Sequence, residues 1–424
     1  MGLTIVQKIM AAHCDKDVVQ PGEIINARVD MVFGNELGAG LAIEHLSRLN
    51  IEEVFDKSRV AIIPDHFTPN KDVVAAEQCK YVREFARKSE IEHYFEVGRM
   101  GIEHVIMHEK GLVVAGELLV GADSHTCTHG ALGCLAVGVG GTDLVSAMVL
   151  GEIWLKVPET IKIVYHGTLA PWVTGKDLIL YTIGKIGIDG ARYKMIEFAG
   201  AALSQLSMDS RFAMANMVVE AGAKSCIFTP DQVMIDYLDK RAARPYVLYS
   251  ADEDAQYEQI IDIDVSDIEL QVAYPHLPSN VKSISKVSAS DNIKVDQVFL
   301  GSCTNGRLED LRLAAEILKG KKIHPHTRMI VIPGSQEVYS HAIEEGLISI
   351  FIAAGAAVGT PTCGPCIGGH MGVLAAKERC VATTNRNFPG RMGHMDSEVY
   401  LAGPAVAAAS AIAGHIAAPW EVLR

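Results

Sequence analysis

The sequence predicts an α/β protein of more than one domain, in which helices pack against largely parallel sheets. Segments with strand-like and helix-like patterns alternate along almost the whole chain, as they do in parallel α/β layers. With 424 residues the chain is too long for one ordinary hydrophobic core, so two or three domains are expected. Its 38 glycines suit tight turns and backbone that lies close to a ligand.

Short apolar runs that end at turn residues predict the strands of these sheets. Residues 60–63 form such a run before Pro64, and residues 329–332 form another before Pro333. Further strands are expected over 118–120, 162–165, 295–300 and 380–383. Helical periodicity predicts helices over 212–221 and 308–319, which end at Gly222 and Gly320.

Proline and polar residues mark two joints between domains. The first joint is Val157-Pro158-Glu159, and the second is the Pro-rich stretch over 274–280. These joints divide the chain into predicted domains at 1–158, 159–276 and 277–424. The sequence contains no evident internal repeat and no low-complexity tail.

Composition excludes several classes of function. The formal net charge of −13 argues against nucleic-acid binding, because phosphates demand Lys and Arg. Nine cysteines spread over a long chain are unlike a secreted disulfide framework and predict a reducing cytoplasm. We find no signal peptide and no run of about eighteen apolar residues, so a membrane partner is not expected.

Three cysteines give the strongest chemical signal. Cys363 and Cys366 form a C-x-x-C pair, and Cys303 follows a predicted strand in the segment Gly-Ser-Cys-Thr-Asn. A thioredoxin-like redox pair is one interpretation, but Gly368 and Gly369 oppose the helix that such a motif opens. A structural zinc site is another, but the second close pair of ligands is missing. We favour the third interpretation, a [4Fe–4S] cluster held by three thiolates.

The number of thiolates determines what such a cluster can do. Four cysteines close the cubane and suit electron transfer. Three cysteines leave one iron open to water, hydroxyl or carboxylate, and that iron can act as a Lewis acid on a departing hydroxyl.

Histidines and carboxylates gather where strands are predicted to end. Asp65 and His66 follow one strand, the segment Asp123-Ser124-His125 follows another, and His104 lies between them in the sequence. Ligands of open α/β sheets bind at the carboxyl ends of strands, so a shared cleft is expected. A carboxylate beside an imidazole supplies a general acid or base near neutral pH. Taken alone, each pair is more typical of a solvated turn.

Two further groups are ambiguous from spacing alone. Asn216 and Glu220 lie four residues apart and share one helix face, which favours a solvated face. Arg386 and Arg391 follow a predicted strand and suit bidentate binding of carboxylates, although a surface loop is the simpler alternative.

Taken together, the motifs identify a family resemblance. The segment Gly-Ser-Cys-Thr-Asn with a distant Cys-Gly-Pro-Cys, together with Asp-Ser-His-Thr and Asn-Arg-Asn-Phe-x-Gly-Arg, resembles the aconitase superfamily. The resemblance runs from about residue 20 to the C-terminus. Length and ending resemble the large subunits of the 3-isopropylmalate dehydratase and homoaconitase type.

The resemblance implies three α/β/α domains around a shared cleft and a [4Fe–4S] cluster with one iron not bound by cysteine. The implied cluster ligands are Cys303, Cys363 and Cys366. The implied catalytic residues are Asp65, His66, His104, Asp123, His125 and Glu220. The implied substrate-binding residues are Ser124, Asn216, Asn385, Arg386 and Arg391. Because the resemblance implies functions for Glu220, Arg386 and Arg391, it overturns the solvated-face and surface-loop interpretations of these residues.

The resemblance also implies a partner. Aconitases carry a fourth, swivel domain that supplies a serine base and a further arginine, and this chain is expected to lack it. We therefore expect a separate small subunit that carries the swivel domain. A glutamine that contacts substrate in aconitases is replaced near residues 35–40 by glycine, which argues against citrate.

The implied reaction is reversible dehydration of a malate-like hydroxy diacid. 3-Isopropylmalate, converted to 2-isopropylmalate in leucine biosynthesis, is the first candidate, and homoaconitate and 2,3-dimethylmalate are the alternatives. A different class of protein, an iron-sensing RNA binder as some relatives become, is opposed by the net charge of −13.

Overall fold

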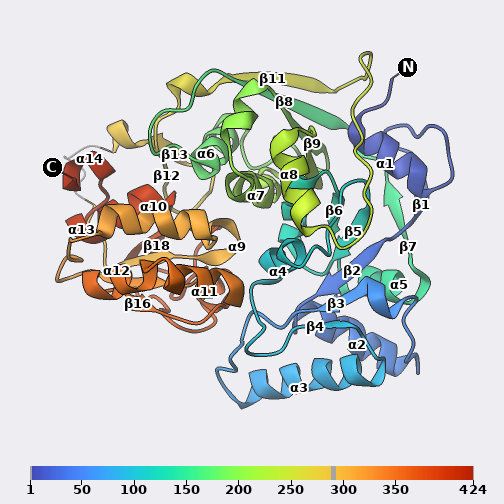
Figure 1. Ribbon diagram of the computed structural model, residues 1–424, viewed down its shortest axis with the longest axis horizontal. Helices are drawn as coiled ribbons and strands as arrows, with labels where there is room; N and C mark the ends of the chain where they lie inside the picture. Colours follow the sequence, from blue (N-terminus) through green and yellow to red (C-terminus); the bar gives the residue numbers. More distant parts are fainter. Residues whose placement is uncertain (1, 288–292, 424) are drawn as a thin grey trace.

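The computed structural model describes residues 2–287 and 293–423, and it is an α/β structure built on three largely parallel sheets. Figure 1 shows the chain passing from one sheet to the next in sequence order. We call the segments that carry β2–β6, β8–β11 and β12–β18 the first, second and third sheet units. The predicted α/β class is confirmed.

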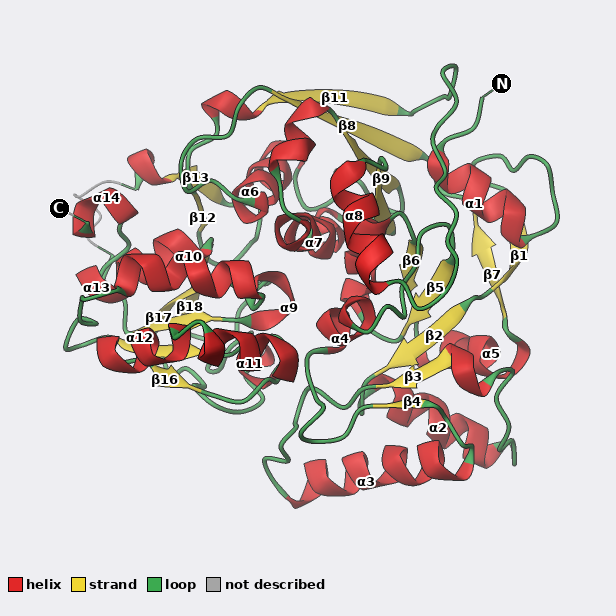
Figure 2. Cartoon of the chain, in the orientation of Figure 1, coloured by secondary structure: helices red, strands yellow, loops and turns green. Residues whose placement is uncertain are grey.

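The first sheet has five parallel strands in the order β4-β3-β2-β5-β6. The strand order reverses between β2 and β5, and the carboxyl ends of strands at such a reversal open onto a crevice. Figure 2 shows α2 and α3 on the outer side of this sheet and α4 toward the middle of the molecule. The strands are β2 (Met31–Gly34), β3 (Val60–Ile62), β4 (His93–Tyr94), β5 (Leu118–Gly121) and β6 (Leu135–Gly138).

Helices and a two-stranded ribbon complete the first sheet unit. The ribbon pairs β1 (Ile24–Arg28) with β7 (Glu152–Lys156) in antiparallel register. The helices are α1 (Ile5–His13), α2 (Gly38–Arg48), α3 (Val73–Lys88), α4 (Glu103–Glu109), the 3₁₀ helix η2 (Ser124–Leu132) and α5 (Gly141–Leu150).

The second sheet has four parallel strands in the order β10-β9-β8-β11. Its strands are β8 (Thr160–His166), β9 (Met195–Ala199), β10 (Ser225–Phe228) and β11 (Gln259–Asp264). Its helices are α6 (Gly175–Ile186), α7 (Met208–Asn216), the 3₁₀ helix η4 (Val218–Ala221) and α8 (Gln232–Arg241).

The third sheet has seven strands, and β14, the middle one of its five parallel strands, stands at a second reversal of strand order. Five strands run parallel in the order β18-β17-β14-β15-β16, and β12 and β13 add an antiparallel edge. The strands are β12 (Gln271–Ala273), β13 (Val281–Ser283), β14 (Gln297–Leu300), β15 (Arg328–Val331), β16 (Ala357–Val358), β17 (Arg379–Ala382) and β18 (Glu398–Ala402).

Helices of the third sheet unit include one that is rich in alanine. The small side chains of α13 are buried against α10 and β14, since alanine lets two elements approach closely. The helices are α9 (Ser302–Asn305), α10 (Leu308–Leu318), α11 (Gln336–Glu344), α12 (Leu347–Ala354), α13 (Pro404–Ala413) and α14 (Pro419–Val422). Within the described residues, every helix is too short or too polar to cross a bilayer.

The predicted strands are confirmed, but one predicted helix is wrong. The continuous helix over 212–221 is interrupted: α7 ends at Asn216, and the chain tightens at Met217 into the 3₁₀ turn η4. Because the winding changes between Asn216 and Glu220, the spacing of a regular helix does not determine the relative direction of their side chains. The domain limits at 158 and 276 stay predictions, and β12 already pairs with β18 of the third sheet.

Three short elements meet at the centre of the molecule. In Figure 1, α4, α7 and α9 lie between the three sheet units. Helix α9 contacts both α4 and α7, and α7 packs on η2. Each sheet unit therefore contributes at least one element to this meeting point.

We expect the packing of η2 on β10 to tolerate no side chain at Gly130. A Cβ atom built there would lie 2.0 Å from the carbonyl oxygen of Cys226. Gly130→Ala should lower the free energy of unfolding by about 2 kcal/mol, the usual cost of overpacking, in urea denaturation.

Gly40→Ala is the matched control, since only Val82 lies within 4 Å of a Cβ there and alanine favours helices. Equal stability of Gly130→Ala and wild type would contradict the close contact between η2 and β10.

Candidate active site at the meeting of the three sheet units

One cavity of about 60 Å³ opens at the carboxyl ends of strands from the first and third sheets. Asp65 and His66 follow β3, Asp123 follows β5, and Cys303 follows β14. Strands β5 and β14 lie directly at a reversal of strand order, and β3 lies one strand away from the first reversal, so their carboxyl ends open toward one crevice. The cavity is lined by Asp65, His66, Ile102, Glu103, His104, Asp123, His125, Cys303, Cys363, Cys366, Ile367, Asn385, Arg386 and Arg391.

Two tight turns place the cysteines. Ser302, directly before Cys303, has a φ of 78°, a left-handed conformation that costs a non-glycine residue free energy and marks a tightly constrained site. Cys363 precedes the 3₁₀ turn over Gly364–Ile367, which contains Cys366 and is followed by Gly368 with a φ of 65°. The three side chains are 3, 7 and 1 % exposed, so bulk water hardly reaches the sulfur atoms.

Polar side chains direct hydrogen atoms at the sulfur atoms. Asn216 and Asn385 donate from Nδ2 to Cys303 Sγ over 3.2 and 3.4 Å, and Arg391 donates from Nη2 to Cys366 Sγ over 3.5 Å. A hydrogen bond from Cys363 and the charge of Arg391 hold the pKa of Cys366 well below its usual value. Burial raises the pKa of Cys303 to about 12. Such donors suit sulfur ligands that carry negative charge.

The three thiols do not form a compact site for a single zinc ion. Four thiolates around zinc lie about 3.8 Å apart, which follows from a Zn–S distance near 2.3 Å and tetrahedral geometry. Within the described residues, no three potential ligand atoms that include a cysteine sulfur all lie within 4.8 Å of one another. Three buried thiols, with hydrogen-bond donors directed at Cys303 and Cys366, fit an iron–sulfur group by the chemistry of the donors.

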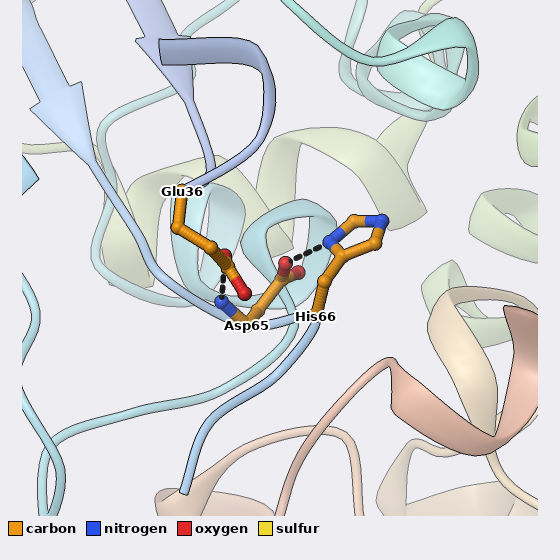
Figure 3. Close-up of side chains that lie close together, drawn as sticks. All are labelled: Glu36, Asp65 and His66. Carbon is orange, nitrogen blue, oxygen red and sulfur yellow. Dashed lines mark hydrogen bonds and ion pairs between the residues drawn. The ribbon is translucent and has the colours of Figure 1, made fainter. Parts of the chain in front are cut away.

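Figure 3 shows Asp65 and His66 beside a second acid, Glu36. His66 Nδ1 donates to Asp65 Oδ1 over 2.5 Å. The Glu36 carboxylate accepts from the backbone N–H groups of Asp65 and Phe67 over 2.9 and 2.6 Å. Burial opposes protonation of His66, but the charge and hydrogen bond of Asp65 outweigh it and raise the pKa of His66 to about 10. The imidazole of His66 is therefore protonated at neutral pH.

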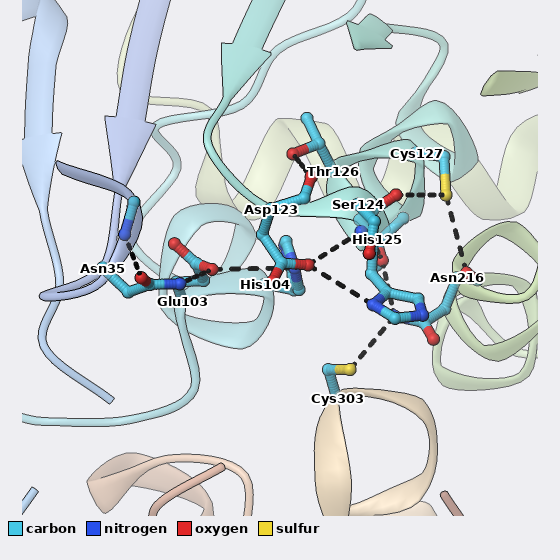
Figure 4. Close-up of polar contacts among 12 residues, drawn as sticks. Asn35, Glu103, His104, Asp123, Ser124, His125, Thr126, Cys127, Asn216 and Cys303 are labelled. Atoms are coloured by element: carbon cyan, nitrogen blue, oxygen red, sulfur yellow. Dashed lines mark hydrogen bonds and ion pairs between the residues drawn. The ribbon is translucent and has the colours of Figure 1, made fainter. Parts of the chain in front are cut away.

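A second network joins two histidines to two carboxylates, and Figure 4 shows its members His104, Asp123 and His125. Asp123 Oδ1 accepts from His104 Nε2 over 2.9 Å and from the backbone N–H of His125 over 2.7 Å. Glu220 Oε1 accepts from His125 Nε2 over 3.0 Å and from Arg386 Nε over 2.7 Å. Burial opposes ionisation of Asp123, but hydrogen bonds from His104 and His125 hold its pKa well below the usual value.

The structure brings together most residues that the sequence analysis named. Asn216 and Glu220 stand behind the lining and contact it through Cys303 and His125. Glu220 is 6 % exposed, so the solvated-face interpretation is wrong, and the burial of Asn385 overturns the surface-loop alternative. Ser124 is exposed and lies outside the cavity lining.

Sequence reasoning missed several residues of the site. Ile102, Glu103 and Ile367 line the cavity, and Glu36 supports Asp65 from behind. The position of Glu36 directly after β2 was the available signal, because Asp65 and Asp123 follow their strands in the same way.

The chain was compared with families of known proteins and with solved structures. Residues 7–414 match the Aconitase family (aconitate hydratase). Over 424 residues the chain is 61 % identical to the 3-isopropylmalate dehydratase large subunit of Moorella thermoacetica, with 100 % of both chains covered. It is 59 % identical over 423 residues to 3-isopropylmalate dehydratase large subunit 1 of Pyrococcus furiosus, again with 100 % of both covered.

Among solved structures, the chain resembles aconitase X of Thermococcus kodakaraensis with a TM-score of 0.50. The match covers 90 % of this chain and 89 % of the other at 14 % identity, which is evidence for the fold alone. The family match spans nearly the whole chain, and the relatives match it end to end. The chain therefore belongs to the aconitase family.

Proposed function

We propose that this chain is the large subunit of a hydro-lyase that interconverts 3-isopropylmalate and 2-isopropylmalate by removing and re-adding water. The observation that carries the proposal is one buried cavity that combines three thiols, two histidine–carboxylate networks and two arginines. The names of the full-length relatives support the substrate, since those proteins are 3-isopropylmalate dehydratase large subunits.

Cys303, Cys363 and Cys366 would hold a [4Fe–4S] cluster with one iron that no cysteine binds. When bound, that iron supplies Lewis acidity to a substrate hydroxyl. The amides of Asn216 and Asn385 and the guanidinium of Arg391 would stabilise the sulfur ligands, because they already donate to Cys303 and Cys366.

His66 would deliver the proton that the departing hydroxyl takes. Its raised pKa keeps the imidazole protonated at neutral pH, and Asp65 fixes the ring so that Nε2 is the free donor. Glu36 holds the backbone on both sides of His66, which limits the positions that the ring can adopt.

The remaining side chains would bind and orient a dicarboxylate. Arg386 and Arg391 line the cavity, and guanidinium groups bind carboxylates in a bidentate manner. Glu220 pairs with both Arg386 and His125, which fixes the arginine and the imidazole relative to each other. Substrate binding by Ser124 and catalytic roles of His104 and Asp123 stay predictions.

A small subunit that carries a swivel domain would complete the site and take the carbon-bound proton. The relatives are named large subunits, which supports such a partner. Homoaconitate and 2,3-dimethylmalate remain alternative substrates, and assays of the assembled pair against all three acids separate them. A cytoplasmic location also stays a prediction.

The cluster proposal predicts a spectrum. Anaerobic reconstitution with iron and sulfide should give a broad visible absorbance, and Cys303→Ser should abolish it because one of three ligands is lost. Cys14→Ser, a cysteine on the partly exposed end of α1, should leave the absorbance unchanged. Stoichiometric zinc binding without the absorbance would contradict the cluster.

The proton-delivery role predicts a kinetic effect. In the reconstituted pair His66→Asn should lower kcat by roughly 10²–10⁴-fold, as for loss of a general acid, with a smaller change in KM. His93→Asn, a change at a partly buried histidine bonded to the carbonyl of Ser58, should leave kcat unchanged. Steady-state rates of hydration decide the matter, and a normal kcat in His66→Asn would exclude the role.

The charged pair of Asp65 and His66 predicts a pH-dependent stability. The pKa of His66 is about 10 in the folded chain and near 6.5 when unfolded, so the pair stabilises fully below pH 6.5. That stabilisation is lost as the pH rises toward 10. Thermal unfolding midpoints of the cluster-free chain should therefore fall more between pH 7 and 10 in wild type than in His66→Asn. Parallel curves would show that the pair adds no such stability.

A further inference from the structure

Three lysine and arginine side chains are fully buried among the residues that the structure describes. Lys176, Arg211 and Arg307 are 0, 0 and 2 % exposed. Arg211 is compensated, since its two Nη atoms donate to both carboxylate oxygens of Asp231. Across residues 2–287 and 293–423, no carboxylate oxygen lies within 4.0 Å of a side-chain nitrogen of Lys176 or Arg307.

A buried cation without a direct ion pair is costly, so two of them in one molecule demand an explanation, although the carboxyl group of Asp310 interacts electrostatically with both. Removing a charge from water costs several kcal/mol, and only a nearby opposite charge with good geometry offsets it. Burial lowers the pKa of Lys176 to about 8, which still leaves the amine protonated at neutral pH. Neither cation lines the cavity itself, so neither is a direct ligand of substrate.

The contacts of both cations lead to segments that present or contact Cys303. Lys176 Nζ donates to the carbonyl oxygens of Thr383 and Thr384 over 3.1 and 2.5 Å. The next residue is Asn385, whose amide donates to Cys303 Sγ. Lys176 therefore contacts the residue directly before Asn385, which donates to Cys303 Sγ.

Arg307 follows Cys303 in the sequence, and its side chain contacts the residue directly after Cys303. Its Nη1 donates to the carbonyl oxygen of Thr304, the neighbour of Cys303, over 2.9 Å. Its guanidinium lies 4.9 Å from the ring centroid of Phe212, and its Nη2 has no hydrogen-bond partner in the described part of the chain. Arg307 therefore borders the segment that presents Cys303, and Lys176 borders the loop that carries Asn385.

We propose that Lys176 and Arg307 are the counter-charges of the three thiolates and of the cluster that they hold. This inference rests on the proposed three-cysteine ligation. Three thiolates outweigh the positive charge of an oxidised cubane, so the assembly is an anion in a site that excludes water. Both residues are positioning residues, because they act on the cluster through the field at Cys303 and not by contact with substrate.

The assignment explains why the two cations come from different parts of the fold. Lys176 stands in the first turn of α6 in the second sheet unit, whereas Arg307 lies between α9 and α10 in the third.

Reduction adds a further negative charge to the cluster, and nearby cations favour that change. Loss of either cation should therefore make the cluster harder to reduce and easier to lose by oxidation.

The test removes charge and keeps a hydrogen-bond donor. Lys176→Gln and Arg307→Gln retain an amide for the carbonyl oxygens, and each full chain is reconstituted anaerobically with iron and sulfide. Redox titration followed by electron paramagnetic resonance should show a more negative midpoint potential in both, equivalent to about a tenfold shift in the reduction equilibrium. Bleaching of the visible absorbance in air should be faster than in wild type.

Two further variants separate charge from structure. Arg211→Gln removes a buried cation that Asp231 already compensates, and it should keep the wild-type potential. Arg307→Lys keeps the charge and should also keep the potential. Thermal unfolding of each cluster-free chain identifies a variant that fails to fold, in which case the other glutamine variant decides.

The outcomes distinguish this inference from the proposed function. If wild-type protein assembles no cluster, the proposed cofactor is wrong and the counter-charge assignment falls with it. If wild type assembles a cluster and both glutamine variants match Arg211→Gln in potential and bleaching rate, the cofactor stands and the counter-charge assignment is wrong.

Discussion

The side-chain amide of Asn216 joins the three sheet units at one point. From the end of α7 it donates to Thr128 of the first unit over 2.8 Å and to Cys303 of the third over 3.2 Å. Its oxygen accepts from Asn385 over 3.0 Å. A buried amide of this kind is costly unless all its hydrogen bonds are made, so the relative placement of the units is tied to the placement of one sulfur atom. The remaining histidine–carboxylate contacts depend on that placement.

The sequence predicted those parts of the site that lie at strand ends. Asp65, His66 and Asp123 could be placed because apolar runs identify strands and parallel strands gather their carboxyl ends. The cysteine spacing indicated the chemistry, and the joint occurrence of the motifs identified the family. Local patterns sufficed here because each signal was carried by a few consecutive residues.

Residues that depend on contacts between units could not be placed in this way. Helical spacing assigns Glu220 to a face of its own helix, but it does not say that His125 and Arg386 cover that face. The break at Met217 follows from packing that no local propensity records. Lys176 and Arg307 look like ordinary surface cations in the sequence, since burial is a property of the whole fold.

The division of the site among the units has a consequence for how the chain could be cut or rebuilt. His125 and Glu220, Asn216 and Cys303, and Lys176 and Thr384 each join residues from two different sheet units. An isolated fragment that contains one sheet unit would hold none of these pairs. The residues of the site therefore come together only when the three sheet units keep their relative positions. A rotation of one unit against its neighbours would separate the histidine–carboxylate pairs and the contacts to the sulfur atom.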